Sequence, residues 1–164
     1  MLEIRNLKKT YGNYHALDGL DMTIPEGSLF GLVGPNGAGK TTAIKIISGL
    51  LLPDEGEVFI GGINVVKEPE KIRELIGYVP DSFGIYDNLM VWEYMEFFAA
   101  AFGLEGITAR KRCENLLAQV GLEDKREFHV DALSRGMQQR LCLARALIHD
   151  PQFIIMDEPT SGLD

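Results

Sequence analysis

The sequence has few cysteines and no long apolar run, and both absences narrow the class of protein. Cys113 and Cys142 are the two cysteines among 164 residues, and each falls in a helical pattern, so a disulfide framework is not expected. No apolar run approaches the roughly 18 residues that cross a bilayer. The start, Met1-Leu-Glu-Ile-Arg5, lacks the apolar stretch of a signal peptide. These absences predict a domain that faces the cytosol and whose two cysteines are reduced.

Positive charge is also scarce. Lysine and arginine number 16 against 24 aspartate and glutamate residues, which gives a formal net charge of −8. This balance argues against a sequence-independent grip on nucleic acid, which depends on basic side chains at the phosphates. A nucleotide-binding protein can still be acidic, because Mg²⁺ and a local set of backbone N–H groups neutralise the phosphates.

One stretch carries a phosphate-binding pattern. Gly34-Pro-Asn-Gly-Ala-Gly-Lys-Thr41 fits the spacing G-x-x-x-x-G-K-[ST]. The apolar run at 29–33 before it predicts a strand buried on both faces, and residues 42–50 after it predict a helix. The sequence therefore predicts a strand, a phosphate loop and a helix in succession.

The residue types of this loop suit a polyphosphate. Glycines allow a tight turn that points successive N–H groups at the anion, and the helix adds the positive end of its dipole. We expect Lys40 to reach the β and γ phosphates and to act in catalysis, and the Thr41 hydroxyl to ligate Mg²⁺. The residues predicted to bind nucleotide here are Gly34, Pro35, Asn36, Gly37, Ala38, Gly39, Lys40, Thr41 and Thr42. The alternative is an ordinary glycine-rich turn between a strand and a helix.

The flanking segments predict an α/β fold. Alternation at residues 2–5 and the apolar residues Met22 and Ile24 predict an antiparallel β layer before the loop, and residues 57–65 predict a hairpin around Gly61-Gly62. A short helix at 69–75 and a strand at 76–79 follow. We therefore expect the α/β fold class, with a P-loop NTPase core, a mostly parallel sheet and this N-terminal antiparallel layer.

The middle of the chain has a helical character. Residues 91–102 and 110–120 have apolar residues at helical spacing, and no strand pattern lies between them. We therefore expect one domain over residues 1–164, incomplete at its C-terminus, with a helical subdomain inserted at 82–132. Phe97, Phe98 and Phe102 are expected in the core of that subdomain.

A second buried strand, at 153–156, ends in two carboxylates. Asp157 stands where the water shell of Mg²⁺ needs an anchor beside a phosphate loop. Glu158 then lies near the γ-phosphate, where it can polarise the attacking water. The alternative is two acidic residues in a solvated loop.

A fourth stretch, Leu133-Ser-Arg-Gly-Met-Gln-Gln-Arg140, opens a helix with Ser134 as a good N-cap. The phosphate loop, this stretch, Asp157-Glu158 and Ser161-Gly-Leu-Asp164 occur in the order seen in ATP-binding cassette (ABC) proteins. The chain resembles that family over its whole length, and LSRGMQ resembles the family signature LSGGQ.

The resemblance implies roles for further residues. Tyr11 resembles the aromatic residue that stacks on adenine, although a plain turn tyrosine is the alternative. Ser134 and Gly136 resemble signature residues that contact the nucleotide of a second ATP-binding subunit, in a head-to-tail homodimer or heterodimer. The helical subdomain resembles the face that receives a transmembrane permease subunit. ATP and Mg²⁺ as cofactors, a cytoplasmic, membrane-peripheral location and no nucleic-acid partner follow from the same resemblance.

The chain departs from the family pattern at three positions. Asp81 stands where the family usually has a glutamine that senses Mg²⁺ and the attacking water, and we expect its carboxylate to reach the metal through a water. Arg135 and Met137 replace the glycine and glutamine of the commonest signature. Such forms resemble the exporter-type (ABC-2-like) ATP-binding subunits.

The family pattern continues beyond the motif at 161–164 with a further strand and a switch histidine. His15, His129 and His149, the three histidines, all precede Asp157, and none fits that role. We therefore expect this chain to be an N-terminal portion that binds nucleotide weakly and hydrolyses it poorly, within a parent protein that is an ATPase.

Several functions remain open at this point. The resemblance favours the motor of a transporter, in which ATP closes a dimer and hydrolysis reopens it. The alternatives are a soluble ABC-type ATPase acting on nucleic acid or ribosomes, an unrelated P-loop kinase or GTPase, and a nucleotide-binding module with little turnover. Substrate and direction of transport are not readable from this chain.

Overall fold

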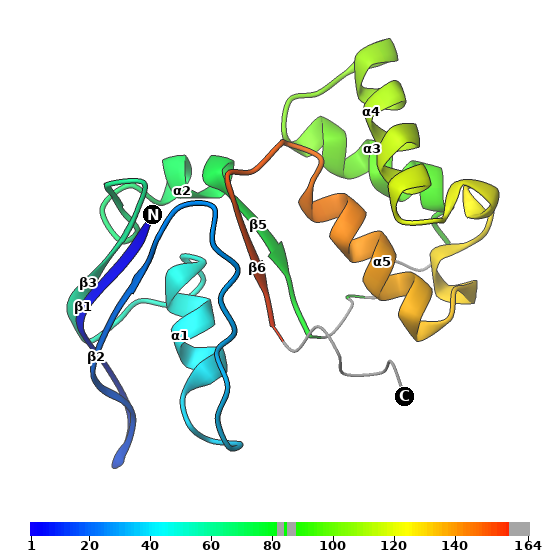
Figure 1. The fold of residues 1–164 in the computed structure, drawn as a ribbon. Coiled ribbons are helices and arrows are strands. Elements are labelled where there is room, and N and C mark those ends of the chain that lie inside the picture. Colours follow the sequence, from blue (N-terminus) through cyan, green and yellow to red (C-terminus); the bar gives the residue numbers. More distant parts are fainter. Residues whose placement is uncertain (82–83, 85–87, 158–164) are drawn as a thin grey trace. The chain divides into compact units, whose positions relative to one another are not determined.

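The computed structural model describes residues 1–164 except 82–83, 85–87 and 158–164. The chain divides into two compact units, Met1–Glu74 and Leu75–Asp164. Figure 1 labels their helices and strands. The first unit contains β1 (Leu2–Tyr11), β2 (Tyr14–Ile24), α1 (Lys40–Ile47), β3 (Glu55–Ile60), β4 (Ile63–Asn64) and α2 (Pro69–Leu75). The second contains β5 (Ile76–Val79), α3 (Val91–Ala101), α4 (Gly106–Gln119), two 3₁₀ turns (Glu123–Lys125 and Val130–Ala132), α5 (Arg135–Ala146) and β6 (Phe153–Met156).

The first unit is built on a four-stranded antiparallel sheet with the order β2-β1-β3-β4. Alternate residues of β1 point to the same face, and Leu2 and Ile4, opposite Ile60 and Val58 of β3, are buried. The β1–β2 hairpin ends with Tyr11 opposite Tyr14. These strands confirm the predicted N-terminal antiparallel layer and the predicted hairpin at 57–65.

The predicted buried strand at 29–33 is wrong for this structure. Residues 29–33 form no strand, and no strand of the described residues pairs with them. Leu29 and Val33 are 103% and 95% exposed. An apolar run indicates residues whose burial is favourable. A strand also needs a neighbouring strand to hydrogen-bond with, and the run itself does not supply one.

The second unit contains a parallel pair of strands. β5 and β6 pair in register from Ile76 opposite Phe153 to Val79 opposite Met156, so both strands end at the same edge. Helix α5 lies against β5. The approach is so close that a Cβ placed on Gly77 would lie 2.5 Å from the carbonyl oxygen of Ala146. This pair is the parallel part of the predicted α/β sheet.

Helices α3, α4 and α5 share one apolar core. On α3 the residues that face it are Val91, Tyr94, Met95 and Ala99. The prediction of three core phenylalanines is only partly right, since Phe98 packs against this core, whereas Phe97 and Phe102 are 57% and 40% exposed. In the described part of the chain no helix is long and apolar enough to cross a membrane. The predicted limits of the helical subdomain, 82–132, stay a prediction.

Candidate nucleotide-binding site

The phosphate loop runs directly into α1. Gly39 is the N-cap of this helix and has φ +83°, as does Gly37 two residues earlier. A Cβ on Gly39 would lie 2.2 Å from the carbonyl oxygen of Ala16 in β2. Only glycine meets both conditions, because it has no Cβ and adopts positive φ at little cost. The motif glycine therefore lets the loop lie against β2.

Lys40 lies folded over the same loop. Its Nζ donates hydrogen bonds to the carbonyl oxygens of Gly34 at 2.6 Å and Pro35 at 2.8 Å. The carbonyl of Pro35 also accepts from the backbone N–H of Ala38 at 3.2 Å. An ammonium group so close to the loop backbone is placed to exchange these neutral acceptors for phosphate oxygens, which form stronger, charge-assisted bonds.

Asn36, Thr41 and Thr42 complete the loop and the first turn of α1. Asn36 and Thr41 are exposed and Thr42 is half-buried. The four first-turn N–H groups of any α-helix lack intrahelical partners, and the N-cap residue Gly39 has no side chain that could accept from them. The loop and the helix dipole together make a site that suits an anion.

Tyr11 stands at the end of β1 with its ring half-exposed. The ammonium nitrogen of Lys9 lies 5.9 Å from the ring centroid and forms a 2.7 Å ion pair with Oδ1 of Asp54. An exposed aromatic face is compatible with stacking on a base, and the adenine-stacking role of Tyr11 stays a prediction.

A second tyrosine of this hairpin contacts the loop directly. The Tyr14 hydroxyl donates a hydrogen bond to the carbonyl oxygen of Gly37. No motif marks Tyr14, because the contact joins residues 23 positions apart in the sequence. A second tyrosine close to Tyr11 was the only hint that the sequence offered.

In the second unit, the predicted metal ligands follow β5 and β6. Asp157 directly follows β6, its backbone N–H donates to the carbonyl oxygen of Val79 at 2.9 Å, and its side chain is buried. Asp81 follows β5 two residues beyond Val79 and is exposed. Burial raises the pKa of Tyr78, and the negative charges of Asp157 and Asp81 add to that rise.

Carboxylate and hydroxyl oxygens are the hard ligands that Mg²⁺ prefers, so the chemistry of the predicted donors fits this ion. Thr41 belongs to the first unit, whereas Asp81 and Asp157 belong to the second. Joint ligation of Mg²⁺ by these residues therefore stays a prediction. Glu158, the predicted catalytic carboxylate, lies outside the described residues.

The signature stretch opens α5 as predicted. Ser134 is the N-cap, and its hydroxyl accepts a 3.4 Å hydrogen bond from the backbone N–H of Met137. Gly136 lies in the first turn. A pocket of about 370 Å³ brings these residues together with Asp157. Its lining residues are Val79, Pro80, Ser134, Gly136, Met137, Gln139, Arg140, Leu143, Met156 and Asp157.

Arg145 fixes α5 in place from inside the second unit. Its Nη1 donates to the Tyr94 hydroxyl at 3.1 Å and its Nη2 to the carbonyl oxygen of Tyr78 at 3.4 Å. The guanidinium carbon lies 5.0 Å from the centroid of the Phe98 ring. Arg145 thus joins α5 to α3 and β5, and no sequence pattern singled it out.

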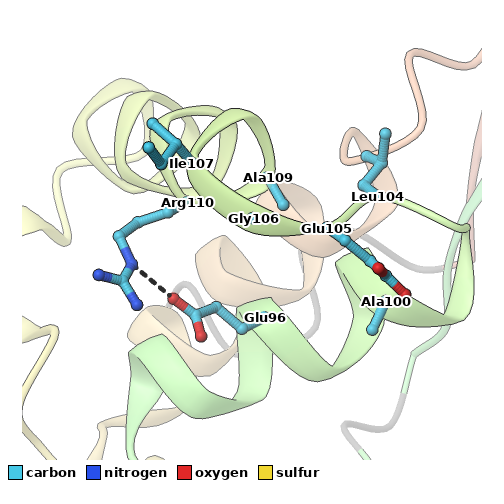
Figure 2. A pocket seen from close by; sticks show the side chains of 8 residues that line it. All are labelled: Glu96, Ala100, Leu104, Glu105, Gly106, Ile107, Ala109 and Arg110. Atoms are coloured by element: carbon cyan, nitrogen blue, oxygen red, sulfur yellow. Dashed lines mark hydrogen bonds and ion pairs between the residues drawn. The ribbon is translucent and has the colours of Figure 1, made fainter.

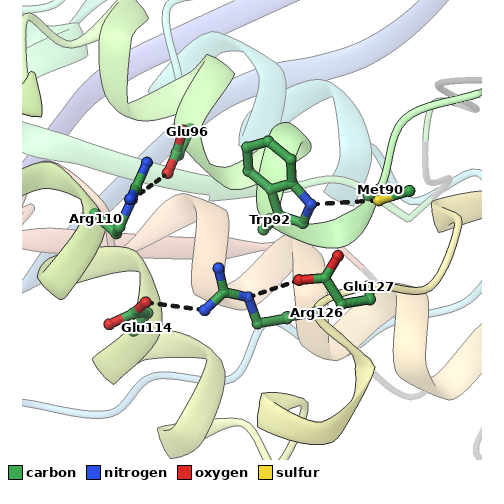
Figure 3. A network of polar contacts seen from close by, with 7 residues as sticks. All are labelled: Met90, Trp92, Glu96, Arg110, Glu114, Arg126 and Glu127. Carbon is green, nitrogen blue, oxygen red and sulfur yellow. Dashed lines mark hydrogen bonds and ion pairs between the residues drawn. The ribbon is translucent and has the colours of Figure 1, made fainter.

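The segment before the signature is tied to α3 and α4 (Figure 3). The Arg126 guanidinium lies 3.0 Å from Glu114 and 3.2 Å from Glu127. The backbone carbonyl of Arg126 accepts from the backbone N–H of Trp92 at 3.1 Å. The carbonyl oxygen of Val130 accepts from Nε2 of Gln138 at 3.3 Å. These contacts position the segment that leads into Ser134.

Comparison with known proteins identifies the family. The family model described as "ABC transporter" matches residues 17–161. The chain is 40% identical to the linearmycin resistance ATP-binding protein LnrL of Bacillus subtilis and 41% identical to the Nod factor export ATP-binding protein I of Ralstonia nicotianae. All 164 residues align in both cases, and they cover 53% and 51% of those relatives. The chain thus spans about half the length of these two relatives.

Solved structures agree with this assignment. A dimeric ATP-binding cassette in a post-hydrolysis state, bound to ADP and Pi, matches with a TM-score of 0.89 and 35% identity. That match covers 100% of this chain and 76% of the other. An ATP-binding subunit of an ABC transporter matches with a TM-score of 0.86 and 32% identity, over 98% of this chain and 67% of the other. The chain therefore belongs to the ABC transporter family, and both the predicted α/β fold class and the predicted kinship with ATP-binding subunits are confirmed.

Proposed function

We propose that the whole protein containing this chain is the ATP-binding subunit of an exporter-type ABC transporter. It binds Mg·ATP at the phosphate loop and hydrolyses it to power transport across a membrane, working as a peripheral protein on the cytoplasmic face. The names of the two relatives, one in resistance and one in export, support the exporter type.

One observation carries the proposal, namely the conformation of residues 34–41. Two glycines with φ +83° lead into a helix whose N-cap residue, Gly39, has no side chain, and the Lys40 ammonium already lies on the loop. This arrangement combines backbone donors, a helix dipole and a cation at one anion site. An ordinary glycine-rich turn does not need backbone donors, a helix dipole and a cation at one place.

In the proposed mechanism the loop residues of this chain hold the polyphosphate, and Lys40 exchanges the Gly34 and Pro35 carbonyls for phosphate oxygens. Thr41, Asp157 and, through a water, Asp81 would hold Mg²⁺, which when bound would neutralise phosphate charge. Glu158 orients and deprotonates the attacking water. Ser134 and Gly136 contact the nucleotide of a second ATP-binding subunit in a head-to-tail dimer.

The first test is Mg·ATP binding and steady-state hydrolysis by the purified full-length protein. Lys40→Ala removes a charged donor, and such bonds contribute about 1.5–3 kcal/mol, so we expect ATP affinity to fall by about 10- to 100-fold. Lys45→Ala is the matched control, because Lys45 is exposed in the last turn of the same helix. Equal affinity of the Lys40→Ala and Lys45→Ala proteins would contradict the proposal.

We further propose that the helical segment 82–132 contacts the transmembrane subunit. Support comes from a surface pocket of about 360 Å³ where α3 meets the start of α4 (Figure 2). Ala100, Leu104 and Ile107 give it an apolar surface, and Ile107 is 76% exposed. Glu96 and Arg110 form a 3.1 Å ion pair beside it. A concave, partly apolar surface with a polar border suits a protein contact.

Co-purification with the membrane subunit tests this contact. Ile107→Asp should reduce the amount of membrane subunit recovered, because a desolvated carboxylate in an apolar contact is costly. Thr108→Asp places the same charge on the neighbouring exposed residue of the same turn and should leave recovery unchanged. Equal recovery with both variants would locate the contact elsewhere, and recovery of nucleic acid or ribosomes instead would favour the other class of ABC ATPase.

A further inference from the structure

The hydroxyl of Tyr14 gives the phosphate loop a support that the family motifs do not include. Tyr14 is the first residue of β2, opposite Tyr11 across the hairpin, and it is 53% exposed. Its hydroxyl donates to the carbonyl oxygen of Gly37, in the middle of the loop. A Cβ placed on Gly37 would lie 3.6 Å from that hydroxyl oxygen, so the ring reaches the loop backbone itself.

This bond fixes one peptide plane of the loop. The peptide between Gly37 and Ala38 is held at its carbonyl end by Tyr14 and at its N–H end by the Pro35 carbonyl at 3.2 Å. A peptide unit is planar and rigid, so two such contacts set the direction of its dipole. The Gly37 carbonyl is thereby turned towards β2, outside the loop.

The direction of that carbonyl matters for an anion. A carbonyl oxygen carries partial negative charge, and one turned into the loop would repel phosphate, whereas a phosphate site needs N–H groups inside. Two further carbonyls of the loop, those of Gly34 and Pro35, accept hydrogen bonds from Lys40. Lys40 leaves them when it moves to phosphate, but the bond from Tyr14 can persist.

We propose that Tyr14 is a positioning residue of the nucleotide site, which holds the Gly37 carbonyl outward and keeps the loop shaped for a polyphosphate. This inference rests on the proposed function of the loop. It assigns to the β1–β2 hairpin two separate tasks, with Tyr11 serving the base and Tyr14 serving the phosphates.

The test compares two ligands on the purified full-length protein. Tyr14→Phe keeps the ring and removes the donor. One hydrogen bond contributes about 0.5–1.5 kcal/mol net, so we expect the dissociation constants of Mg·ATP and of inorganic tripolyphosphate with Mg²⁺ both to rise by about 3- to 10-fold. Ser28→Ala is the matched control, because it removes an exposed hydroxyl that donates to the Pro25 carbonyl outside the loop, and it should bind both ligands as the unchanged protein does. The ligand-free melting temperature of Tyr14→Phe should stay close to that of the unchanged protein.

The outcomes separate the two hypotheses. If the unchanged protein binds ATP and Tyr14→Phe binds both ligands equally well, the positioning role of Tyr14 is wrong while the proposed function stands. The same conclusion follows if Tyr14→Phe weakens ATP alone, because the effect then lies at the base. If the unchanged protein binds neither ligand, the proposed function itself is overturned.

Discussion

The N-terminal ends of α1 and α5 differ in whether the N-cap residue accepts a hydrogen bond from the first turn of its helix. Helix α1 begins after Gly39, which has no side chain to cap it, whereas α5 begins after Ser134, whose hydroxyl accepts the N–H of Met137. The far end of α5 is satisfied as well, since Arg112 donates to the carbonyl oxygens of Leu147 at 2.9 Å and Ile148 at 3.1 Å. The comparison teaches that α5 has a side-chain acceptor for a first-turn N–H group at its N-cap, whereas the N-cap residue of α1 has no side chain to supply one.

Burial separates the two regions further. Residues 29–33, which lead into the phosphate loop, are exposed despite their apolar character. Leu141, Ala144 and Ile148, on or just after α5, are almost completely buried in the core shared with α3 and α4. We therefore expect substitutions of the buried side chains of α5 to act mainly on stability, and substitutions of the exposed side chains of the phosphate loop to act mainly on ligand binding.

The largest expected effect lies in the core of the second unit. Leu141 is fully buried, and Leu141→Ala leaves a cavity that should lower the free energy of unfolding by about 2–5 kcal/mol. Leu52→Ala is the control, because Leu52 is 66% exposed. Urea denaturation of both variants gives the measurement, and similar midpoints for the two would break the proposed contrast between the regions.

Protection of backbone amides by bound Mg·ATP tests the difference between α1 and α5 directly. At a ligand concentration about 100 times the dissociation constant, binding stabilises the native state by about 2.7 kcal/mol. We expect Mg·ATP to slow amide hydrogen exchange most strongly in the first turn of α1, by up to about 100-fold, because these N–H groups contact the phosphates. The amides of α5 should change much less at protein concentrations that keep the protein monomeric. Equal slowing in both helices would contradict the assignment of the anion site to α1.

Glycine-to-alanine substitutions probe the backbone at the two helix starts. Gly39→Ala forces a side chain into φ +83° and against the Ala16 carbonyl, so it should cost about 1–3 kcal/mol. Gly136→Ala is the matched change in the first turn of α5, where an added Cβ has no described atom within 4 Å. Because alanine is the better helix former, Gly136→Ala should leave stability unchanged or raise it. Thermal unfolding without ligand measures the stability of both variants. If Gly39→Ala lost no more stability than Gly136→Ala, Gly39 would not be conformationally required.

The cap of α5 accounts for a smaller effect. Ser134→Ala removes the acceptor for the Met137 N–H and should lower the free energy of unfolding by about 0.5–2 kcal/mol. Ser134→Asn keeps a good N-cap residue and should restore most of that loss. The denaturant midpoints of the two variants test this prediction. Equal losses of stability in both would mean that the Ser134 hydroxyl does not cap the helix.

The smallest effect concerns pH at the far end of α5. Burial lowers the pKa of His149; the charge of Arg112 lowers it too, whereas the bond from Nε2 to the Ile76 carbonyl and the charge of Asp150 oppose the shift. The ring stacks on Phe102 at 3.9 Å, and Nδ1 is buried with no hydrogen-bond partner among the described residues. The folded state therefore favours neutral His149 and binds fewer protons than the unfolded state below the ordinary pKa of 6.5.

It follows that this contribution to stability is complete above about pH 6.5 and is lost as the pH falls through the folded-state pKa. Urea midpoints measured between about pH 7.5 and pH 5 should decline less steeply in His149→Gln than in the unchanged protein. His129→Gln, at an exposed histidine, should leave the slope in place. An identical slope in His149→Gln would show that His149 does not carry this dependence.

Much of the candidate site could be predicted because its signals are local. The spacing of Gly34 to Thr41, the Ser134 cap and the position of Asp157 after an apolar strand each depend on a few consecutive residues. Turn, cap and strand chemistry act over the same short range. The structure accordingly places each of these residues at a helix start or at a strand end.

The predictions that failed depended on distant partners. The run at 29–33 was predicted as a strand from hydrophobicity alone, yet a strand exists only where another strand pairs with it. Phe97 and Phe102 were predicted in the core because they fit a helical period, but the packing of α4 and α5 decides which face of α3 is covered. In each case the local pattern was compatible with more than one environment.

The amino-acid sequence alone determined the family, the phosphate loop, the signature cap and, apart from the strand expected at 29–33, the order of the strands and helices, because each is encoded in short-range residue chemistry. Only the tertiary structure decided that Tyr14 contacts the Gly37 carbonyl, that Arg145 joins α5 to Tyr94 and Tyr78, and that Asp157 shares a pocket with Ser134. These contacts join residues about 20 to 70 positions apart. Such pairings depend on how whole elements pack, so no single stretch of sequence contains them.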